Sequence, residues 1–151
     1  MKSIFPDKIS PKIPGILLIS HGTLALGAVE AAEMILGETE NLAALCFEGD
    51  CNPEDFGHKI KDTVEAFPAG CLVLVDLMGG TPFNQLMLEA PRDRYRAVCG
   101  MNLSMVAEVI SNRADLSLEE LAQTAVSAGT AGVVDVAAFL SKRMMSQDHS
   151  K

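Results

Sequence analysis

Four short apolar runs, separated by segments with helical character, constrain the fold of this chain more than any other feature. The first and third runs are almost continuously hydrophobic, a pattern typical of strands buried on both faces of a parallel sheet. Strands that alternate with helices predict an open, mostly parallel α/β sheet with right-handed crossovers. The four predicted strands are Ile16–Ser20, Leu42–Phe47, Leu72–Asp76 and Tyr95–Cys99.

Helix signals fill the gaps between the predicted strands. Asn52-Pro53 and Thr81-Pro82 each place a capping side chain before a proline, which fits the start of a helix. Ser117 and Glu120 have the spacing of a capping box. Helices are therefore predicted to begin after Asn52, Thr81 and Ser117 and to cover residues 24–36, 103–112 and 137–145, with Val133–Val136 as a short fifth strand.

Length and charge argue against several classes of function. The 151 residues suit one domain, and no apolar stretch approaches the roughly 18 residues of a membrane-spanning helix. The net charge of −8, with no tryptophan and one tyrosine, argues against nucleic-acid and membrane-surface binding. The four cysteines form no C-x-x-C pair, so we expect reduced thiols and no metal site.

The two ends of the chain differ from its middle. Residues 1–14 contain three prolines and no continuous apolar core, so they do not have the pattern of a signal peptide. We expect them to form a short arm ahead of the domain. Residues 15–146 are predicted as the folded domain and residues 147–151 as a frayed tail.

Two polar residues end predicted strands that we expect to be neighbours. His21 follows the first strand, with Gly22 allowing a tight turn behind it, and Asp76 ends the third. In a flavodoxin-like sheet of order 2-1-3-4, the first and third strands are adjacent, and ligands bind at the carboxyl ends where the chain reverses direction. His21 and Asp76 are therefore expected to meet there, although 55 positions separate them.

The segment from Gly79 to Pro82 adds chemistry suited to phosphate. Gly79-Gly80 lets the backbone approach a ligand closely, and the helix after it begins with N–H groups that favour an anion. A neutral imidazole is a nucleophile, and a carboxylate that accepts the N–H of one ring nitrogen leaves the other free to attack. The set predicts a histidine that takes up a phosphoryl group, with Thr81 supplying a hydroxyl. The lack of a Walker A sequence argues against ATP as a donor bound on this chain.

Each of these residues also has an ordinary structural interpretation. His21 can be a turn residue, Asp76 can cap a loop, and Thr81 can cap its helix. His58 and His149 are interpreted as surface and tail residues without a catalytic role. A histidine phosphatase would need Arg-His-Gly and a nucleophile-elbow hydrolase would need G-x-S-x-G, and the sequence contains neither motif.

Three segments, GILLISHG, VLVDLMGGTPFN and AVCGMNLSM, together resemble the mannose-family (mannose/fructose/sorbose) enzyme IIA component of the bacterial phosphoenolpyruvate-dependent sugar phosphotransferase system. The resemblance covers about Gly15 to Leu140. It implies that His21 is the phosphorylated histidine and that Asp76 orients it. The hydroxyl position of the glycine loop falls on Thr81, where many relatives have serine. The other positions of the expected site are Gly79 and Gly80 beside the phosphate, with Gly22, Asn84 and Asn102 as supports.

The resemblance also implies partners. Members of this family accept phosphate from phospho-HPr and pass it to a IIB domain, which phosphorylates a sugar entering through the IIC and IID membrane components. They form homodimers that exchange a short C-terminal strand, and Val133–Val136 is the segment expected to form this antiparallel edge strand. No Ala/Pro-rich linker to a fused IIB is present, so a separate IIB component is the expected acceptor. A cytoplasmic phosphocarrier without a cofactor is therefore expected, and a regulatory module that uses the same phosphohistidine is the alternative.

Overall fold

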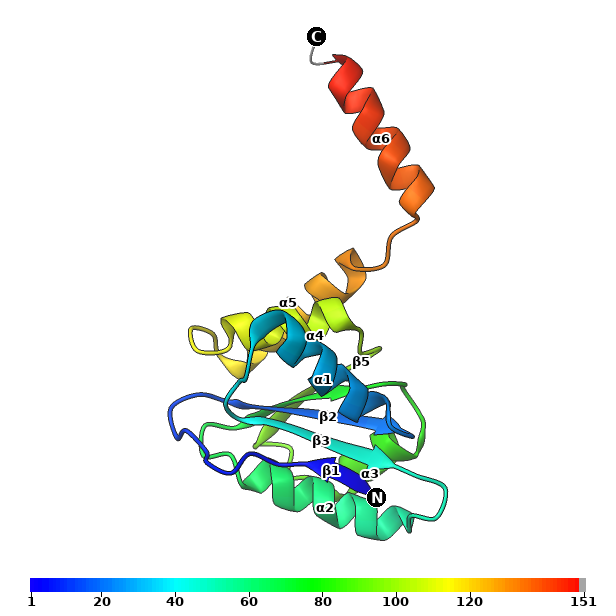
Figure 1. Cartoon of the computed structure of the whole chain (residues 1–151). Helices are drawn as coiled ribbons and strands as arrows, with labels where there is room; N and C mark the ends of the chain where they lie inside the picture. Colours follow the sequence, from blue (N-terminus) through cyan, green and yellow to red (C-terminus); the bar gives the residue numbers. More distant parts are fainter. Residues whose placement is uncertain (150–151) are drawn as a thin grey trace.

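A computed structural model describes residues 1–149, in which a central sheet separates two layers of helices (Figure 1). Within these residues the sheet has five strands in the order β1-β3-β2-β4-β5. Strands β2 to β5 are parallel, and β1 runs antiparallel to β3 at one edge. The strands are β1 (Lys2–Ile4), β2 (Gly15–His21), β3 (Leu42–Phe47), β4 (Cys71–Val75) and β5 (Tyr95–Cys99).

The order of the four parallel strands confirms the predicted 2-1-3-4 arrangement. β2 and β4 are neighbours, with Gly15 opposite Cys71 and Ile19 opposite Val75. Apart from His21, every residue of these two strands is buried, which explains why both segments are almost uniformly apolar. The carboxyl ends of β2 and β4 therefore lie side by side at one end of the sheet.

Helices cover both faces of the sheet (Figure 1). Three helices, α1, α4 and α5, pack on one face, and α2 and α3 pack on the other. Alternate residues of a strand point to opposite faces, so Leu18 joins the first layer while Leu17 and Ile19 join the second. The helices are α1 (Leu24–Leu36), α2 (Pro53–Glu65), α3 (Thr81–Glu89), α4 (Leu103–Asn112), α5 (Leu118–Ala131) and α6 (Val136–His149).

Capping residues fix where the helices begin. The Asn52 side chain accepts hydrogen bonds from two backbone N–H groups in the first turn of α2, as predicted. Ser117 and Glu120 form the predicted capping box of α5. At α3 the cap residue is Gly80 and Thr81 is already helical, so the prediction that Thr81 caps this helix is wrong.

The N-terminal arm contributes a strand that the sequence did not predict. β1 pairs with β3, with Lys2 opposite Cys46. Further along the arm, the buried Asn41 side chain accepts a hydrogen bond from the Ser10 N–H at 2.8 Å. It donates to the carbonyls of Ser10 and Ile13 at 2.8 and 2.9 Å. These bonds hold both ends of the arm against the domain.

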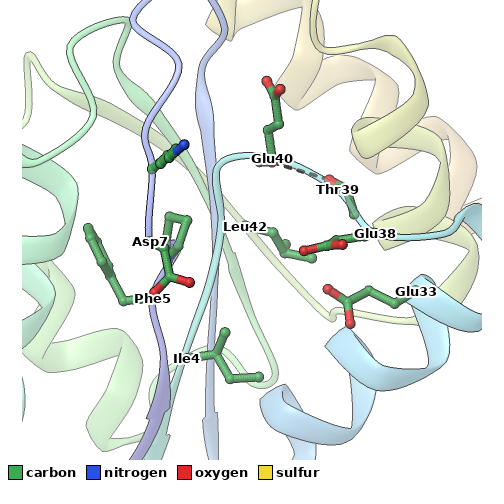
Figure 2. A pocket seen from close by; sticks show the side chains of 10 residues that line it. Ile4, Phe5, Asp7, Glu33, Glu38, Thr39, Glu40 and Leu42 are labelled. Carbon is green, nitrogen blue, oxygen red and sulfur yellow. Dashed lines mark hydrogen bonds between the residues drawn. The ribbon is translucent and has the colours of Figure 1, made fainter.

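A cavity of about 590 Å³ lies between this arm and the loop that leads into β3 (Figure 2). The side chains of Asp7, Glu33 and Glu38 border it, together with the apolar Ile4 and Leu42. Leu42 is the first residue of β3, so the cavity lies at the amino ends of the parallel strands. It is therefore at the end of the sheet opposite to His21 and Asp76.

The C-terminal segment differs from the prediction. α5 ends at Ala131, and α6 begins at Val136 with no strand between them. A short strand needs a neighbour to bond its backbone, and no described strand of this single chain lies beside Val133 and Val134, which are 76% and 50% exposed. The predicted strand at Val133–Val136 is therefore wrong for the isolated chain, and the antiparallel edge strand is β1 instead.

Helix α6 leads away from the rest of the domain (Figure 1). It reaches His149, so it includes the first part of the predicted frayed tail, and residues 150–151 lie outside the described residues. Within residues 1–149, no single helix combines the length and apolar composition that a membrane crossing needs. α5 and α6 meet that test only as a pair, and the pair is bent by 87° at its break.

All four cysteines are free thiols, as predicted. Cys46 and Cys71 are buried in strands, whereas Cys51 and Cys99 are half-buried. Burial raises the pKa of the Cys71 thiol well above its ordinary value, so this side chain behaves as a small apolar core residue.

Candidate functional site

His21 stands at the carboxyl end of β2. Its neighbours on the same strand face, Leu17 and Ile19, are buried against α2 and α3, so alternation places the imidazole on that face as well. Gly22 follows with a φ of +54°, a left-handed conformation that turns the chain away from the strand at once. The His21 side chain is 46% exposed. The strand therefore presents the imidazole at the rim of the sheet.

Asp76 reaches His21 from the neighbouring strand β4. Its Oδ2 accepts two hydrogen bonds from His21, one from the backbone N–H at 2.9 Å and one at the imidazole Nδ1 at 2.8 Å. The Asp76 backbone N–H donates to the Ile19 carbonyl at 3.2 Å, which extends the ladder between β2 and β4. The Asp76 side chain is only 9% exposed, and its Oδ1 is buried without a hydrogen-bond partner among the described residues.

The hydrogen bond to Asp76 decides which imidazole nitrogen is available for chemistry. An ionised carboxylate only accepts hydrogen bonds, so Nδ1 carries the proton that it shares with Asp76. In a neutral imidazole the free lone pair is then on Nε2. His21 thus offers a nucleophilic nitrogen at an exposed position, with its tautomer fixed from the protein side.

Nε2 faces the loop that begins α3. A Cβ added at Gly80 would lie 2.5 Å from His21 Cε1 and 2.9 Å from Nε2, so only glycine allows the chain to pass this close to the ring. Gly79 has a φ of +85°, and its carbonyl accepts a hydrogen bond from Asn84 Nδ2 at 3.3 Å. The two glycines and Asn84 therefore shape the approach of α3 to the imidazole.

The first turn of α3 can neutralise a negative charge next to Nε2. The helix begins at Thr81, and within residues 1–149 no side chain bonds to its N-terminal N–H groups as a cap. These N–H groups and the positive end of the helix dipole favour an anion such as phosphate. Thr81 is half-buried and brings a hydroxyl to the same end. An anionic group bonded to Nε2 would meet partial positive charge here.

Asn102 connects the first turn of α4 to the end of α5, beside the site. Its side chain accepts a hydrogen bond from the Met105 N–H at 3.0 Å, which caps α4, and donates to the Gly129 carbonyl of α5 at 2.8 Å. Met101 donates its backbone N–H to the Val75 carbonyl at 3.0 Å. These bonds fix the turn after β5 against the end of β4, from which Asp76 extends.

Sequence reasoning did not single out Ser20 and Phe47. Ser20 is fully buried, and its Oγ accepts a hydrogen bond from the Ala25 N–H at 2.8 Å, which fixes the start of α1 next to His21. Phe47 lies opposite His21 in the pairing of β2 with β3, and the two ring centroids are 6.5 Å apart. The sequence feature that could have pointed to Ser20 and Phe47 is their position, since both residues lie at the ends of predicted strands.

The other side chains that could react are two histidines, which lie away from His21, and the Cys99 thiol, which stays protonated. His58 is on α2 with its Nε2 3.8 Å from a Glu89 carboxylate oxygen, and His149 ends α6. Burial, and then the charge of Asp76, raise the pKa of the half-buried Cys99 thiol, which keeps it protonated and unreactive. In the part of the chain that the structure describes, no three His, Cys, Asp or Glu residues are grouped as metal ligands.

Known proteins are similar to this domain in sequence and in fold. Residues 15–126 match the family described as "PTS system fructose IIA component". The chain is 34% identical over 122 residues to the PTS system mannose-specific EIIAB component of Escherichia coli (strain K12), covering 78% of this chain and 38% of that protein. It is 34% identical over 111 residues to the PTS system fructose-specific EIIA component of Bacillus subtilis (strain 168), covering 70% of this chain and 75% of that protein. The crystal structure of phosphotransferase system component EIIA from Streptococcus agalactiae superposes with a TM-score of 0.77 at 28% identity, over 83% of this chain and 99% of that one.

Proposed function

The chain belongs to the PTS system fructose IIA component family, and we propose that it is a phosphocarrier whose His21 carries the phosphoryl group on Nε2. One observation carries this proposal. His21 Nδ1 is hydrogen-bonded to Asp76 Oδ2 at 2.8 Å, while Nε2 faces the start of α3 beside Gly80. The arrangement supports a nucleophile on one side of the ring and a stabilising carboxylate on the other.

The proposed step is a direct phosphoryl transfer. The Nε2 lone pair of His21 attacks the phosphorus atom of the donor, and the bond from phosphorus to the donor's leaving atom breaks as the N–P bond forms. The electron pair of the broken bond returns to the donor. The imidazole then carries a positive charge, which Asp76 stabilises through Nδ1–H. The N–H groups at the start of α3 stabilise the phosphoryl oxygens, because in-line transfer needs mainly positioning and charge neutralisation.

The proposed donor is phospho-HPr, and the proposed acceptor is a separate IIB component that serves sugar uptake. The relative from E. coli is named as an EIIAB component, and this chain spans 38% of its length. The relative from B. subtilis is named as an EIIA component alone. Both names support a role in a sugar phosphotransferase system. Reversal of the transfer step at Nε2 would deliver the phosphoryl group to the acceptor.

An exposed apolar rim around His21 supports the docking of partner proteins. Leu24, Leu77 and Met78 are 55%, 59% and 73% exposed, and Leu103 is 39% exposed. All four lie in loops or first helical turns that follow the carboxyl ends of strands. Exposed apolar patches mark protein interfaces more often than chance. We infer that donor and acceptor use this rim in turn, because both must bring a reacting atom to Nε2.

We also propose that the protein is a cytoplasmic homodimer. Free cysteines support a reducing compartment. Apolar side chains of α6, such as Phe139 and Leu140 at 49% and 51% exposure, would be covered by a second subunit. In that dimer Val133–Val136 would pair with a free sheet edge of the partner. Sedimentation equilibrium should show a dimer for the full chain and a monomer for a variant ending at Ala131, and a dimer that survives this truncation would contradict the exchange.

Phosphorylation from phosphoenolpyruvate through enzyme I and HPr tests the proposed carrier function. The full chain is expected to gain one acid-labile phosphate, and His21→Ala is expected to gain none. His58→Ala is the matched control, because His58 is a surface histidine on α2 and should leave labelling unchanged. Labelling that persists in His21→Ala would overturn the assignment of the site.

A further inference from the structure

We propose that Phe47 is a positioning residue for the His21 imidazole, an inference that rests on the proposed function of His21 as phosphoryl carrier. The ring is 46% exposed, and its side-chain bond to Asp76 is one hydrogen bond of 2.8 Å. One hydrogen bond to a ring nitrogen does not by itself fix both side-chain dihedral angles, χ1 and χ2, of the imidazole. The direction of Nε2 must therefore be set by packing.

Phe47 packs against the imidazole from β3. The two residues are opposite each other in the parallel pairing, and the Gly22 N–H donates to the Phe47 carbonyl at 2.7 Å, which continues the ladder past His21. Neighbouring strands are about 4.8 Å apart, so residues in register on the same face place their side chains together. The ring planes of Phe47 and His21 meet at 83° with centroids 6.5 Å apart, an edge-to-face contact.

The Phe47 ring is itself held by the core. It contacts the ring of Phe56 on α2, with centroids 5.2 Å apart at 68°. Phe56 is fully buried, whereas Phe47 is half-buried, so the pair connects the closely packed interior to the exposed imidazole. Gly80 approaches the same imidazole from the segment after β4, close enough that an added Cβ would lie 2.5 Å from Cε1.

Between Phe47 and Gly80, the imidazole is held in the orientation that pairs Nδ1 with Asp76 and turns Nε2 toward α3. Removing the Phe47 ring opens space beside His21, and the imidazole can then adopt rotamers that break the bond to Asp76. Misplacing a reacting atom by about 1 Å can cost on the order of 10²-fold in rate. Since the loosened ring still samples the productive orientation, we expect phosphorylation of Phe47→Leu to slow by roughly tenfold, with the KM for the donor unchanged.

Nuclear magnetic resonance of the ring nitrogens tests this positioning without any phosphoryl transfer. Long-range ¹H–¹⁵N spectra of the full chain report how the proton is shared between Nδ1 and Nε2. Wild type and Phe47→Tyr, which keeps the aromatic ring, should both show the Nδ1–H tautomer of His21. In Phe47→Leu the two nitrogen shifts should move toward each other.

Phe67→Leu is the matched control. Phe67 is fully buried in the same core layer, but it precedes β4 and so lies at the amino ends of the strands, far from His21. This variant should lose stability and keep the His21 nitrogen shifts and the transfer rate. Thermal unfolding of both leucine variants measures the loss of stability that they share.

Unchanged nitrogen shifts and an unchanged transfer rate in Phe47→Leu would overturn the positioning role. Equal changes in Phe47→Leu and Phe67→Leu would also overturn it, because the effect would then be a general loss of stability. If the nitrogen shifts change only in Phe47→Leu while the wild-type protein accepts no phosphate, the positioning of the ring is upheld and the carrier function is refuted.

Discussion

Replacing Gly80 by alanine should disable the site while the fold stays in place. Gly80 has a φ of −81° and a ψ of 175°, which any residue adopts, so alanine adds no backbone strain. At the N-cap of α3, alanine is less favourable than glycine, so the change should lower the free energy of unfolding by less than about 1 kcal/mol. The new Cβ would lie 2.5 Å from His21 Cε1, where carbon atoms normally keep about 3.5–4.0 Å.

The imidazole must therefore move by about 1 Å or more to restore a normal contact distance. The His21 side chain is 46% exposed, so the added methyl group would push the ring toward solvent, and this movement would lengthen the 2.8 Å contact between Nδ1 and Asp76 Oδ2. The alanine methyl group would also cover Nε2, the proposed point of attack. A displacement of this size costs on the order of 10²-fold in rate, or about 2.7 kcal/mol of activation free energy.

Single-turnover phosphorylation by phospho-HPr measures this loss, and thermal unfolding measures stability separately. Gly49→Ala is the matched control, because Gly49 lies in the loop after β3 and an added Cβ there meets no atom within 4 Å. Gly49→Ala should keep the wild-type rate. A Gly80→Ala protein that accepts phosphate within about threefold of the wild-type rate would refute the reasoning that α3 fixes the reacting ring by close contact.

Two further predictions concern Asp76 and Cys71. Asp76→Asn keeps the size of the side chain but removes the charge that stabilises the phosphorylated imidazole, so single-turnover transfer should slow by about 10²-fold or more while thermal unfolding changes little. A wild-type rate in this variant would make Asp76 a structural cap only. Burial raises the pKa of the Cys71 thiol, so the folded protein keeps a proton that the unfolded chain releases above about pH 8.5. Above that pH, Cys71 should make the free energy of unfolding fall by about 1.4 kcal/mol per pH unit. When this free energy is measured by urea denaturation at several pH values, it should fall less steeply with pH in Cys71→Ala than in wild type, by the contribution of one proton. Equal pH dependences in the two proteins would contradict this.

The parallel core and the contact between His21 and Asp76 could be predicted because strands buried on both faces have nearly continuous apolar sequences. β2 and β4 are buried on both faces, so their apolar runs stand out, and the topology of alternating strands and helices then brings their carboxyl ends together. The hydrogen bonds of 2.8 and 2.9 Å from His21 to Asp76 follow from this adjacency.

The two ends of the chain were harder to predict because a short edge strand forms only where another strand offers it a free edge, and the local sequence does not show this. β1 has three residues, none of them fully buried, and it forms only because β3 offers a free edge. Val133 and Val134 have the β-branched side chains of a strand, but the single chain gives them no strand to pair with. Phe47 was missed for a related reason, since its contact with His21 follows from the register of β2 and β3.

The position of the phosphoryl group on the imidazole tests the central claim most directly. The full chain, labelled with ¹⁵N and phosphorylated through HPr, should show a one-bond ³¹P–¹⁵N coupling at Nε2 of His21, with Nδ1 still protonated against Asp76. This result would follow from the 2.8 Å contact that occupies Nδ1 and leaves Nε2 facing α3. A phosphoryl group on Nδ1, or on any residue other than His21, would contradict the account.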